Sequence, residues 1–203
     1  MENKKFHYDV ALSFAGEDRD FVETCAELLR AMGLNVFYDN YEKENLAGKD
    51  LYSFLGQIYR DKAQYAVVFV SSAYKTKLWT RHELKFITAR SFSQPEEYLI
   101  PVRMDSTSLD SIPDTIGYIQ GNSPNDVARL IAKKVNPKID IDLMFEQLKY
   151  YLPDYKLSID GCDVVFECAE ENFNARYPLS LMMELYRCDL IFGAFIAPAI
   201  VPN

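Results

Sequence analysis

Residues 8–22 read YDVALSFAGEDRDFV, and this stretch decides the fold class. Residues 8–14 are rich in aromatic and aliphatic side chains and predict a strand, which Ala15-Gly16 ends. Apolar residues then recur on one helical face from residue 18 to residue 32, and Gly33 follows where helices often end in a left-handed residue. A strand that leads through small residues into a helix is typical of a β–α–β unit.

The same alternation continues along the chain. We predict further strands at 34–38, 64–70 and 98–102, and helices at 50–60, 79–90 and 124–136. Residues 64–70 read QYAVVFV, a nearly continuous apolar run that is typical of a strand buried on both faces. Pro101 lies near the end of the fourth strand and indicates an edge or terminal position. The pattern predicts a doubly wound α/β domain with a parallel sheet and helices on both faces.

The chain of 203 residues is long for one domain, and its charge is uneven. Residues 1–136 carry a formal charge of −2 and residues 137–203 carry −6. In the second part we predict a helix at 141–151, a hairpin of strands 155–160 and 162–169, a helix at 179–188 and an apolar strand at 190–197. We therefore expect a main domain (1–136) and a small acidic α+β appendage (137–203) that docks on the main domain or on another chain.

Composition narrows the functional classes. The net charge of −8 disfavours a nucleic-acid binder, and the four cysteines form neither a CxxC pair nor a zinc-binding spacing. The longest apolar run has 13 residues, short of the roughly 20 of a membrane span, and the polar start lacks the pattern of a signal peptide. Neither G-x-G-x-x-G nor a Walker phosphate loop is present, so the sequence lacks the common motifs that bind a dinucleotide cofactor or ATP. We expect a cytoplasmic protein with no metal, no nucleic acid and no membrane partner.

Two motifs fall at the carboxyl ends of the first and third strands, where doubly wound sheets bind their ligands. In the first, SFAGEDR, backbone N–H groups at the helix start can approach an anion or a ring closely, or simply make a tight capped turn. In the second, LWTRHEL, Trp79 and Glu83 share one face of a helix. An indole beside a carboxylate suits a reaction that builds positive charge on a sugar. Taken alone, the pair is better explained as a packing residue and an acid matched to the helix dipole.

Together the segments YDVALSFAGEDRDFV, VFYDN, VVFVSSAY and LWTRHEL resemble the Toll/interleukin-1 receptor (TIR) domain, in particular its bacterial and plant-type members. The resemblance covers roughly residues 5–135. It implies a flavodoxin-like sheet of five parallel strands, and we place the weakly marked fifth strand at 115–120. Two positions depart from plant members, which usually carry Arg where Ala15 stands and Cys where Thr80 stands.

The resemblance implies an NAD+ nucleosidase, which cleaves the nicotinamide–ribose bond and gives nicotinamide with ADP-ribose or a cyclic or rearranged ADP-ribose. NAD+ is then the substrate, and no cofactor is expected. Glu83, the last residue of the W-x-x-x-E segment, corresponds to the catalytic glutamate of the family. The substrate contacts that the resemblance implies are Phe14, Ala15, Gly16, Arg19, Asp39, Lys49, Ser71, Tyr74 and Trp79.

The loop from Asp39 to Lys49 corresponds to the segment through which TIR domains assemble with one another and gate the site. The resemblance therefore implies self-association, and its bacterial character implies anti-phage defence with a separate effector protein that responds to the product. The alternative is a non-catalytic TIR adaptor or scaffold, which needs the fold and this loop but does not need Glu83.

Overall fold

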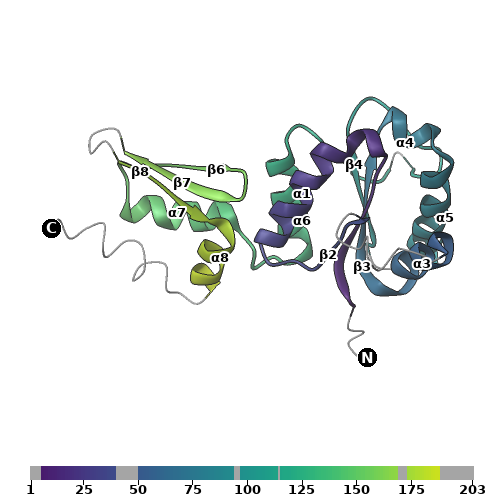
Figure 1. Ribbon diagram of the computed structural model, residues 1–203, viewed down its shortest axis with the longest axis horizontal. Helices are drawn as coiled ribbons and strands as arrows, with labels where there is room; N and C mark the ends of the chain where they lie inside the picture. The colour runs from purple at the N-terminus through teal and green to yellow at the C-terminus, as the bar shows by residue number, and fades with distance from the viewer. Residues whose placement is uncertain (1–5, 40–49, 94–96, 114, 169–172, 188–203) are drawn as a thin grey trace.

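The computed structural model describes residues 6–39, 50–93, 97–113, 115–168 and 173–187, without the side chains of residues 51–52 and 78–81. Five parallel strands form the main sheet in the order β2-β1-β3-β4-β5 (Figure 1). The strands are β1 (Tyr8–Ser13), β2 (Val36–Phe37), β3 (Ala63–Val70), β4 (Leu99–Arg103) and β5 (Ile119–Gln120). This is the flavodoxin-like order, so the predicted fold class is confirmed.

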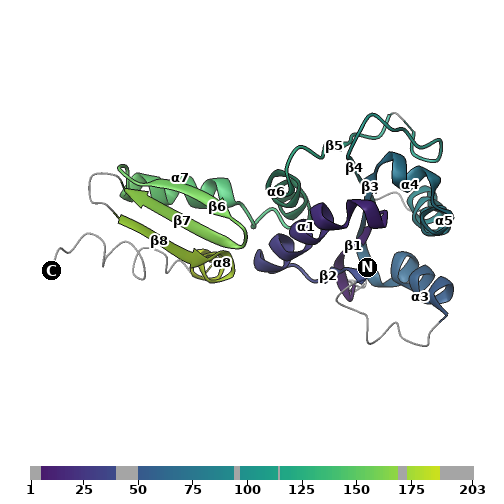
Figure 2. The same ribbon diagram turned by 45° about the horizontal axis from the view of Figure 1, so that its top comes forward.

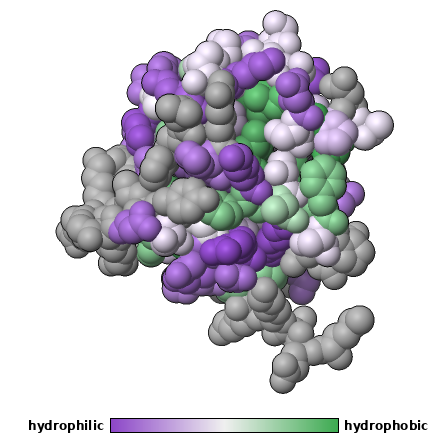
Figure 3. Space-filling view, turned by 90° about the vertical axis from the view of Figure 1, so that its right-hand side faces the viewer, coloured by the Kyte–Doolittle hydropathy of each residue, from purple (hydrophilic) through white to green (hydrophobic). Residues whose placement is uncertain are grey.

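Helices cover both faces of this sheet (Figure 1). One face carries α1 (Arg19–Ala31) and α6 (Pro124–Val135). The other carries α3 (Leu51–Gln57), the π-helical turn η3 (Ile58–Lys62), α4 (Ser72–Thr76) and α5 (Leu78–Ser93). Hydrophilic side chains mix with smaller hydrophobic areas on the outer surface of the α3–α5 side (Figure 3). Within the described residues, no helix is both long and apolar enough to cross a membrane.

The central strand β3 explains why its sequence is apolar almost throughout. Val67 and Phe69 enter the core beneath α1 and α6, whereas Val68 and Val70 enter the core beneath α5. Because successive side chains of a strand point to opposite faces, both faces of β3 need apolar residues.

Three details differ from the sequence prediction. The prediction for Pro101 is wrong, because β4 lies between β3 and β5. The short strand β5 pairs only with Val102 and Arg103, so the ladder on that side does not reach the proline. The segment after β3, SSAYKTK, reads as a loop in the sequence but contains α4, whose cap is Ser71. The helix predicted at 50–60 is α3 continued by the turn η3.

The C-terminal part contains a second sheet, antiparallel and ordered β6-β7-β8 (Figure 2). Its elements are α7 (Ile141–Tyr151), β6 (Lys156–Asp160), β7 (Asp163–Cys168), β8 (Phe173–Pro178) and α8 (Leu179–Arg187). The predicted helix at 141–151 and the predicted hairpin are confirmed, and Gly161 takes the positive φ of 58° that the turn requires. β8 was not predicted; its sequence FNARYP alternates apolar and polar residues as a strand does, but it is short and ends in proline. The strand predicted at 190–197 lies outside the described residues.

The C-terminal elements contact the main sheet's helices. Arg187 of α8 donates a hydrogen bond to the carbonyl of Met32 at the end of α1, and Lys133 of α6 lies 2.8 Å from Asp140. Buried apolar side chains form one cluster that continues from α1 through α7 to α8. The division of the chain after residue 136 stays a prediction.

Candidate active site

The carboxyl ends of β1 and β3 lie side by side, and both are followed by polar, helix-initiating segments. Ser13, the last residue of β1, is in register with Val68 of β3. Beyond β1 the chain enters the short 3-10 turn η1 (Gly16–Asp18), and beyond β3 it enters α4. These are the two segments that the sequence placed at the ligand-binding edge of the sheet.

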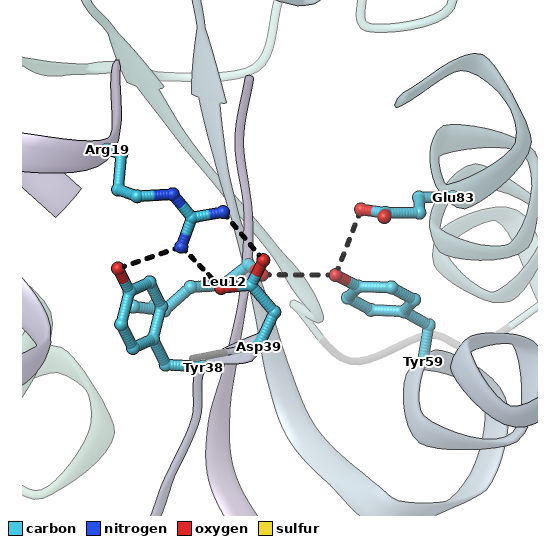
Figure 4. A network of polar contacts seen from close by, with 6 residues as sticks. All are labelled: Leu12, Arg19, Tyr38, Asp39, Tyr59 and Glu83. Atoms are coloured by element: carbon cyan, nitrogen blue, oxygen red, sulfur yellow. Dashed lines mark hydrogen bonds and ion pairs between the residues drawn. The ribbon is translucent and has the colours of Figure 1, made fainter. Parts of the chain in front are cut away.

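Glu83 projects from α5 towards this edge and is only 8% exposed. Its Oε2 atom accepts a hydrogen bond of 2.6 Å from the Ser13 hydroxyl and one of 3.1 Å from the Tyr59 hydroxyl (Figure 4). A buried carboxylate is costly unless it is hydrogen-bonded, and hydroxyl donors favour its charged form. The arrangement therefore holds the Glu83 carboxyl group in a fixed orientation in a site largely closed to solvent.

The hydroxyl network around Glu83 extends to a third residue. The Tyr74 hydroxyl lies 2.8 Å from Ser13 Oγ, and because Ser13 gives its one hydrogen to Glu83, Tyr74 is the donor in this pair. Burial, with the charge of Glu83 as a second cause, raises the pKa of Tyr59 and of Tyr74 far above the ordinary tyrosine range. Both tyrosines are therefore neutral donors at physiological pH.

A second polar group lies on the opposite side of Leu12 from Glu83 (Figure 4). Arg19 donates to both carboxylate oxygens of Asp39, at 2.9 and 2.8 Å, and to the Tyr38 hydroxyl at 3.2 Å. The guanidinium carbon lies 5.1 Å from the centre of the Phe14 ring, which stacks on the Tyr38 ring at 5.5 Å. The bonds to Asp39 raise the pKa of Arg19 above its usual range. The cluster presents an aromatic surface and a fixed cation together.

The other residues implied by the resemblance differ in exposure. Ala15 is buried, whereas Gly16 is exposed and has open space around the position of a side chain. The Ser71 hydroxyl caps α4 by accepting from the Tyr74 backbone at 3.0 Å, and it donates to Asp18 at 2.6 Å. The Ser71 hydroxyl and the Tyr74 backbone N–H are thus both hydrogen-bonded within the protein.

Two of the expected residues cannot be placed. Lys49 lies outside the described residues, and so does the side chain of Trp79, although its backbone belongs to α5. The loop between Asp39 and Lys49 is outside the description as well.

Ser13, Tyr38 and Tyr59 belong to these contacts but were not singled out from the sequence. Ser13 and Tyr38 stand inside the quoted segments at the carboxyl ends of predicted strands, so this position in the sequence could have identified them. Tyr59 had no such signal, because it lies in a π-helical turn whose phase differs from that of a regular helix.

Other features of the described residues lie apart from Glu83. A cleft of about 510 Å³ separates β5 and α6 from the start of α7, and two cations on its wall are already paired, Arg129 with Asp142 and Lys133 with Asp140. Among the residues that the structure describes, no group of three or more His, Cys, Asp or Glu side chains is placed to hold a metal ion.

The sequence is similar to known proteins over much of its length. Residues 10–131, more than half of the chain, match the family model described as TIR domain. The chain is 49% identical over 137 residues to the 3′ cyclic ADP-D-ribose synthase AaTIR of Aquimarina amphilecti, across 66% of this chain and 42% of that protein. It is 30% identical over 103 residues to the NAD(+) hydrolase TcpC of Escherichia coli, across 50% of this chain and 33% of that protein. The chain thus spans less than half the length of these two relatives.

Among solved structures, the TIR domain of the Toll-related receptor TRR-2 from Hydra magnipapillata superposes with a TM-score of 0.51 at 16% identity. The superposition covers 65% of this chain and 98% of that domain. At this identity the likeness shows the fold.

Proposed function

Because the chain belongs to the TIR domain family, we propose that it cleaves NAD+ at the nicotinamide–ribose bond, with Glu83 as the catalytic carboxylate. The observation that carries the proposal is the buried Glu83, oriented by Ser13 and Tyr59 at the ligand-binding edge of the sheet. The names of two relatives, an NAD(+) hydrolase and a cyclic ADP-D-ribose synthase, support the same bond cleavage.

The reaction needs a stabiliser of positive charge rather than a strong acid. When the C1′–N bond breaks, its electron pair goes to the pyridinium nitrogen, so nicotinamide leaves as a neutral molecule. The positive charge moves to the ribosyl C1′ and its ring oxygen, as in an oxocarbenium-like transition state. A fixed carboxylate in a water-poor site stabilises that charge more than bulk water does. This is the role we assign to Glu83.

The ADP-ribosyl cation is then captured by a nucleophile. Water gives ADP-ribose, and a hydroxyl of the substrate gives a cyclic ADP-ribose; in each case the attacking oxygen loses one proton. The name of AaTIR favours the cyclic outcome, and that of TcpC favours hydrolysis.

Substrate contacts follow from the edge of the sheet. We propose that Phe14, Ala15 and Gly16 contact the nicotinamide riboside end of the substrate. Phe14 supplies an aromatic ring there, and the position of Gly16 adjoins open space. Arg19 supplies a cation for the diphosphate, and its present partner Asp39 must share or release it. Ser71 and Tyr74 form part of the wall of the site at the end of β3. Lys49 and Trp79 are the remaining residues that we propose as substrate contacts.

The biological setting is part of the same proposal. We infer that two copies of the chain assemble through the loop from Asp39 to Lys49, and that the activity serves anti-phage defence in the cytoplasm. A separate effector protein would respond to a cyclic product. The family membership supports the assembly, and the names of the relatives support the signal.

The test is incubation of concentrated protein with NAD+, followed by chromatography and mass spectrometry. We expect nicotinamide release from the wild type and a loss of about 100-fold or more in Glu83→Gln, which keeps the size of the side chain but removes its charge. Glu167→Gln is the matched control, since Glu167 is a half-exposed carboxylate on β7 that pairs with Lys156 at 3.4 Å. Full activity in Glu83→Gln would show that Glu83 is not the catalytic carboxylate. An inactive wild type, even when assembled, would favour the scaffold.

A further inference from the structure

The helix α5 contains two buried charges. In the described part of the chain, Glu83 and Arg90 are the charged residues that are buried, at 8% and 6% exposure. They stand seven positions apart, two helical turns or about 10 Å, and therefore on the same face of α5. Buried charges are expensive, so two on one face call for an explanation by their partners.

Tyr59 touches both charged side chains and is itself only 1% exposed. At its main-chain end, its carbonyl accepts a hydrogen bond of 3.0 Å from Arg90 Nη1. At its other end, the single hydroxyl hydrogen is shared between two acceptors, Glu83 Oε2 and the carbonyl of Leu12, each 3.1 Å from the hydroxyl oxygen. The residue thus spans from one charge of α5 to the other.

The main chain of Tyr59 is held at a turn that is rare in proteins. η3 is a π-helical turn, and such turns occur frequently at functional sites. Arg90 donates to the carbonyl of Tyr59 within the turn and to that of Ala63 (2.7 Å), which follows the turn, and it lies over the Tyr98 ring at 3.9 Å. The Tyr98 hydroxyl donates to the Tyr59 carbonyl at 2.5 Å. The tyrosine cannot shift along α5 without breaking these bonds.

We propose that Tyr59 is a positioning residue for the catalytic carboxylate: η3, clamped by Arg90, holds the Tyr59 hydroxyl on Glu83 Oε2 and so fixes the carboxylate plane. This inference rests on the function proposed above. Ser13 and Tyr59 approach the same oxygen from different elements, β1 and η3. Two donors on Oε2 set the direction of Oε1, the orientation that charge stabilisation requires.

The direct test is Tyr59→Phe, which removes only the hydroxyl. We expect kcat to fall by about 10- to 100-fold, the usual effect of one hydrogen bond to a charged group, with KM changed by less than about threefold. The acid limb of the rate–pH profile moves to higher pH, because the lost donor favoured the ionised carboxylate. If Tyr59 only contributed to packing, the folded variant would keep both the wild-type kcat and the wild-type acid limb. The control is Tyr155→Phe, at a tyrosine of the C-terminal part that is 9% exposed.

A second variant covers the case in which Tyr59→Phe does not fold. Replacement of Tyr59 by difluorotyrosine keeps the ring and hydroxyl but makes the phenol a stronger donor, so the acid limb moves to lower pH. Unchanged kcat and an unchanged acid limb in the folded variants would overturn the inference.

The experiments distinguish a failure of the inference about Tyr59 from a failure of the proposed function. Glu83→Gln and the wild type are measured beside the Tyr59 variants, so an active, Glu83-dependent enzyme with a silent Tyr59 defeats only the inference. If the wild type releases no nicotinamide, the function proposal fails, and carboxyl-carbon NMR of Glu83 then decides whether Tyr59 holds it. A titration midpoint of Glu83 that is the same in wild type and Tyr59→Phe rejects that hold, and an upward shift supports it.

Discussion

Arg90→Met removes the cation that α5 directs at the carbonyls of Tyr59 and Ala63. The change keeps an unbranched, flexible side chain, shorter than that of Arg, but removes the guanidinium. It deletes hydrogen bonds to the carbonyls of Tyr59 and Ala63, each worth about 1.5–3 kcal/mol because the donor is charged. It also deletes the cation–π contact with Tyr98, worth about 0.5–2 kcal/mol.

Part of this loss is offset, because the variant no longer buries a charge. That desolvation costs several kcal/mol in the wild type, so the net loss in the free energy of unfolding comes to about 2–4 kcal/mol. The Tyr59 carbonyl keeps its bond from Tyr98, which places the result below the sum of the parts. For a chain of this size, the melting temperature falls by about 5–15 °C.

Urea and thermal unfolding followed by circular dichroism measure the effect. Arg60→Met is the matched control: Arg60 also donates to a carbonyl, that of Gly56 at 3.1 Å, and lies over the Phe86 ring at 5.3 Å, but it is exposed. We expect the control to lose less than about 1 kcal/mol. Equal losses in the two variants would refute the reasoning that Arg90 clamps η3.

Three further predictions concern single residues. Hydrogen bonds from Thr107 and Ser72 lower the pKa of Asp105 to about 2, so its contribution is present above its unfolded pKa of about 4 and is lost as pH falls towards 2. Asp105→Asn should therefore cost about 1 kcal/mol in urea unfolding at pH 7 and progressively less as pH falls towards 2; a pH-independent cost contradicts this. Burial raises the pKa of Cys25 to about 12, so iodoacetamide at pH 8 should leave Cys25 unmodified in the folded protein, as peptide mass mapping will report. Gly33 has φ of 86°, so Gly33→Ala should lower the melting temperature by several degrees, and an unchanged melting curve would show that this turn relaxes.

Elements with strong local signals were predictable from the sequence. The helix at 141–151 has an Asp140 cap and apolar periodicity, and the Asp160-Gly161 turn specifies the hairpin of β6 and β7. The alternation of strands and helices predicted a doubly wound parallel sheet, whereas its strand order came from the resemblance to TIR domains. For the local elements, neighbouring residues in the chain carry the information.

Features that depend on distant partners were not predictable. β8 is a strand because β7 offers a full ladder of partners from Asp163 to Cys168, although its own sequence is short, contains Asn174 and ends in Pro178. Pro101 is tolerated inside the sheet because β5 stops short of it. Glu83 was recognised from its spacing to Trp79, but its donors Ser13 and Tyr59 stand 70 and 24 residues away in sequence.

The position of those donors links the site to the packing of α5. Glu83 comes from α5, Ser13 from β1 and Tyr59 from η3, so the carboxylate is oriented only when α5 is docked on the sheet. Glu83 and Arg90 both bind Tyr59, Glu83 at the hydroxyl and Arg90 at the carbonyl. These hydrogen bonds compensate part of the cost of burying the two side chains. A shift of α5 on the sheet would therefore disturb the orientation of Glu83 and the turn η3 together.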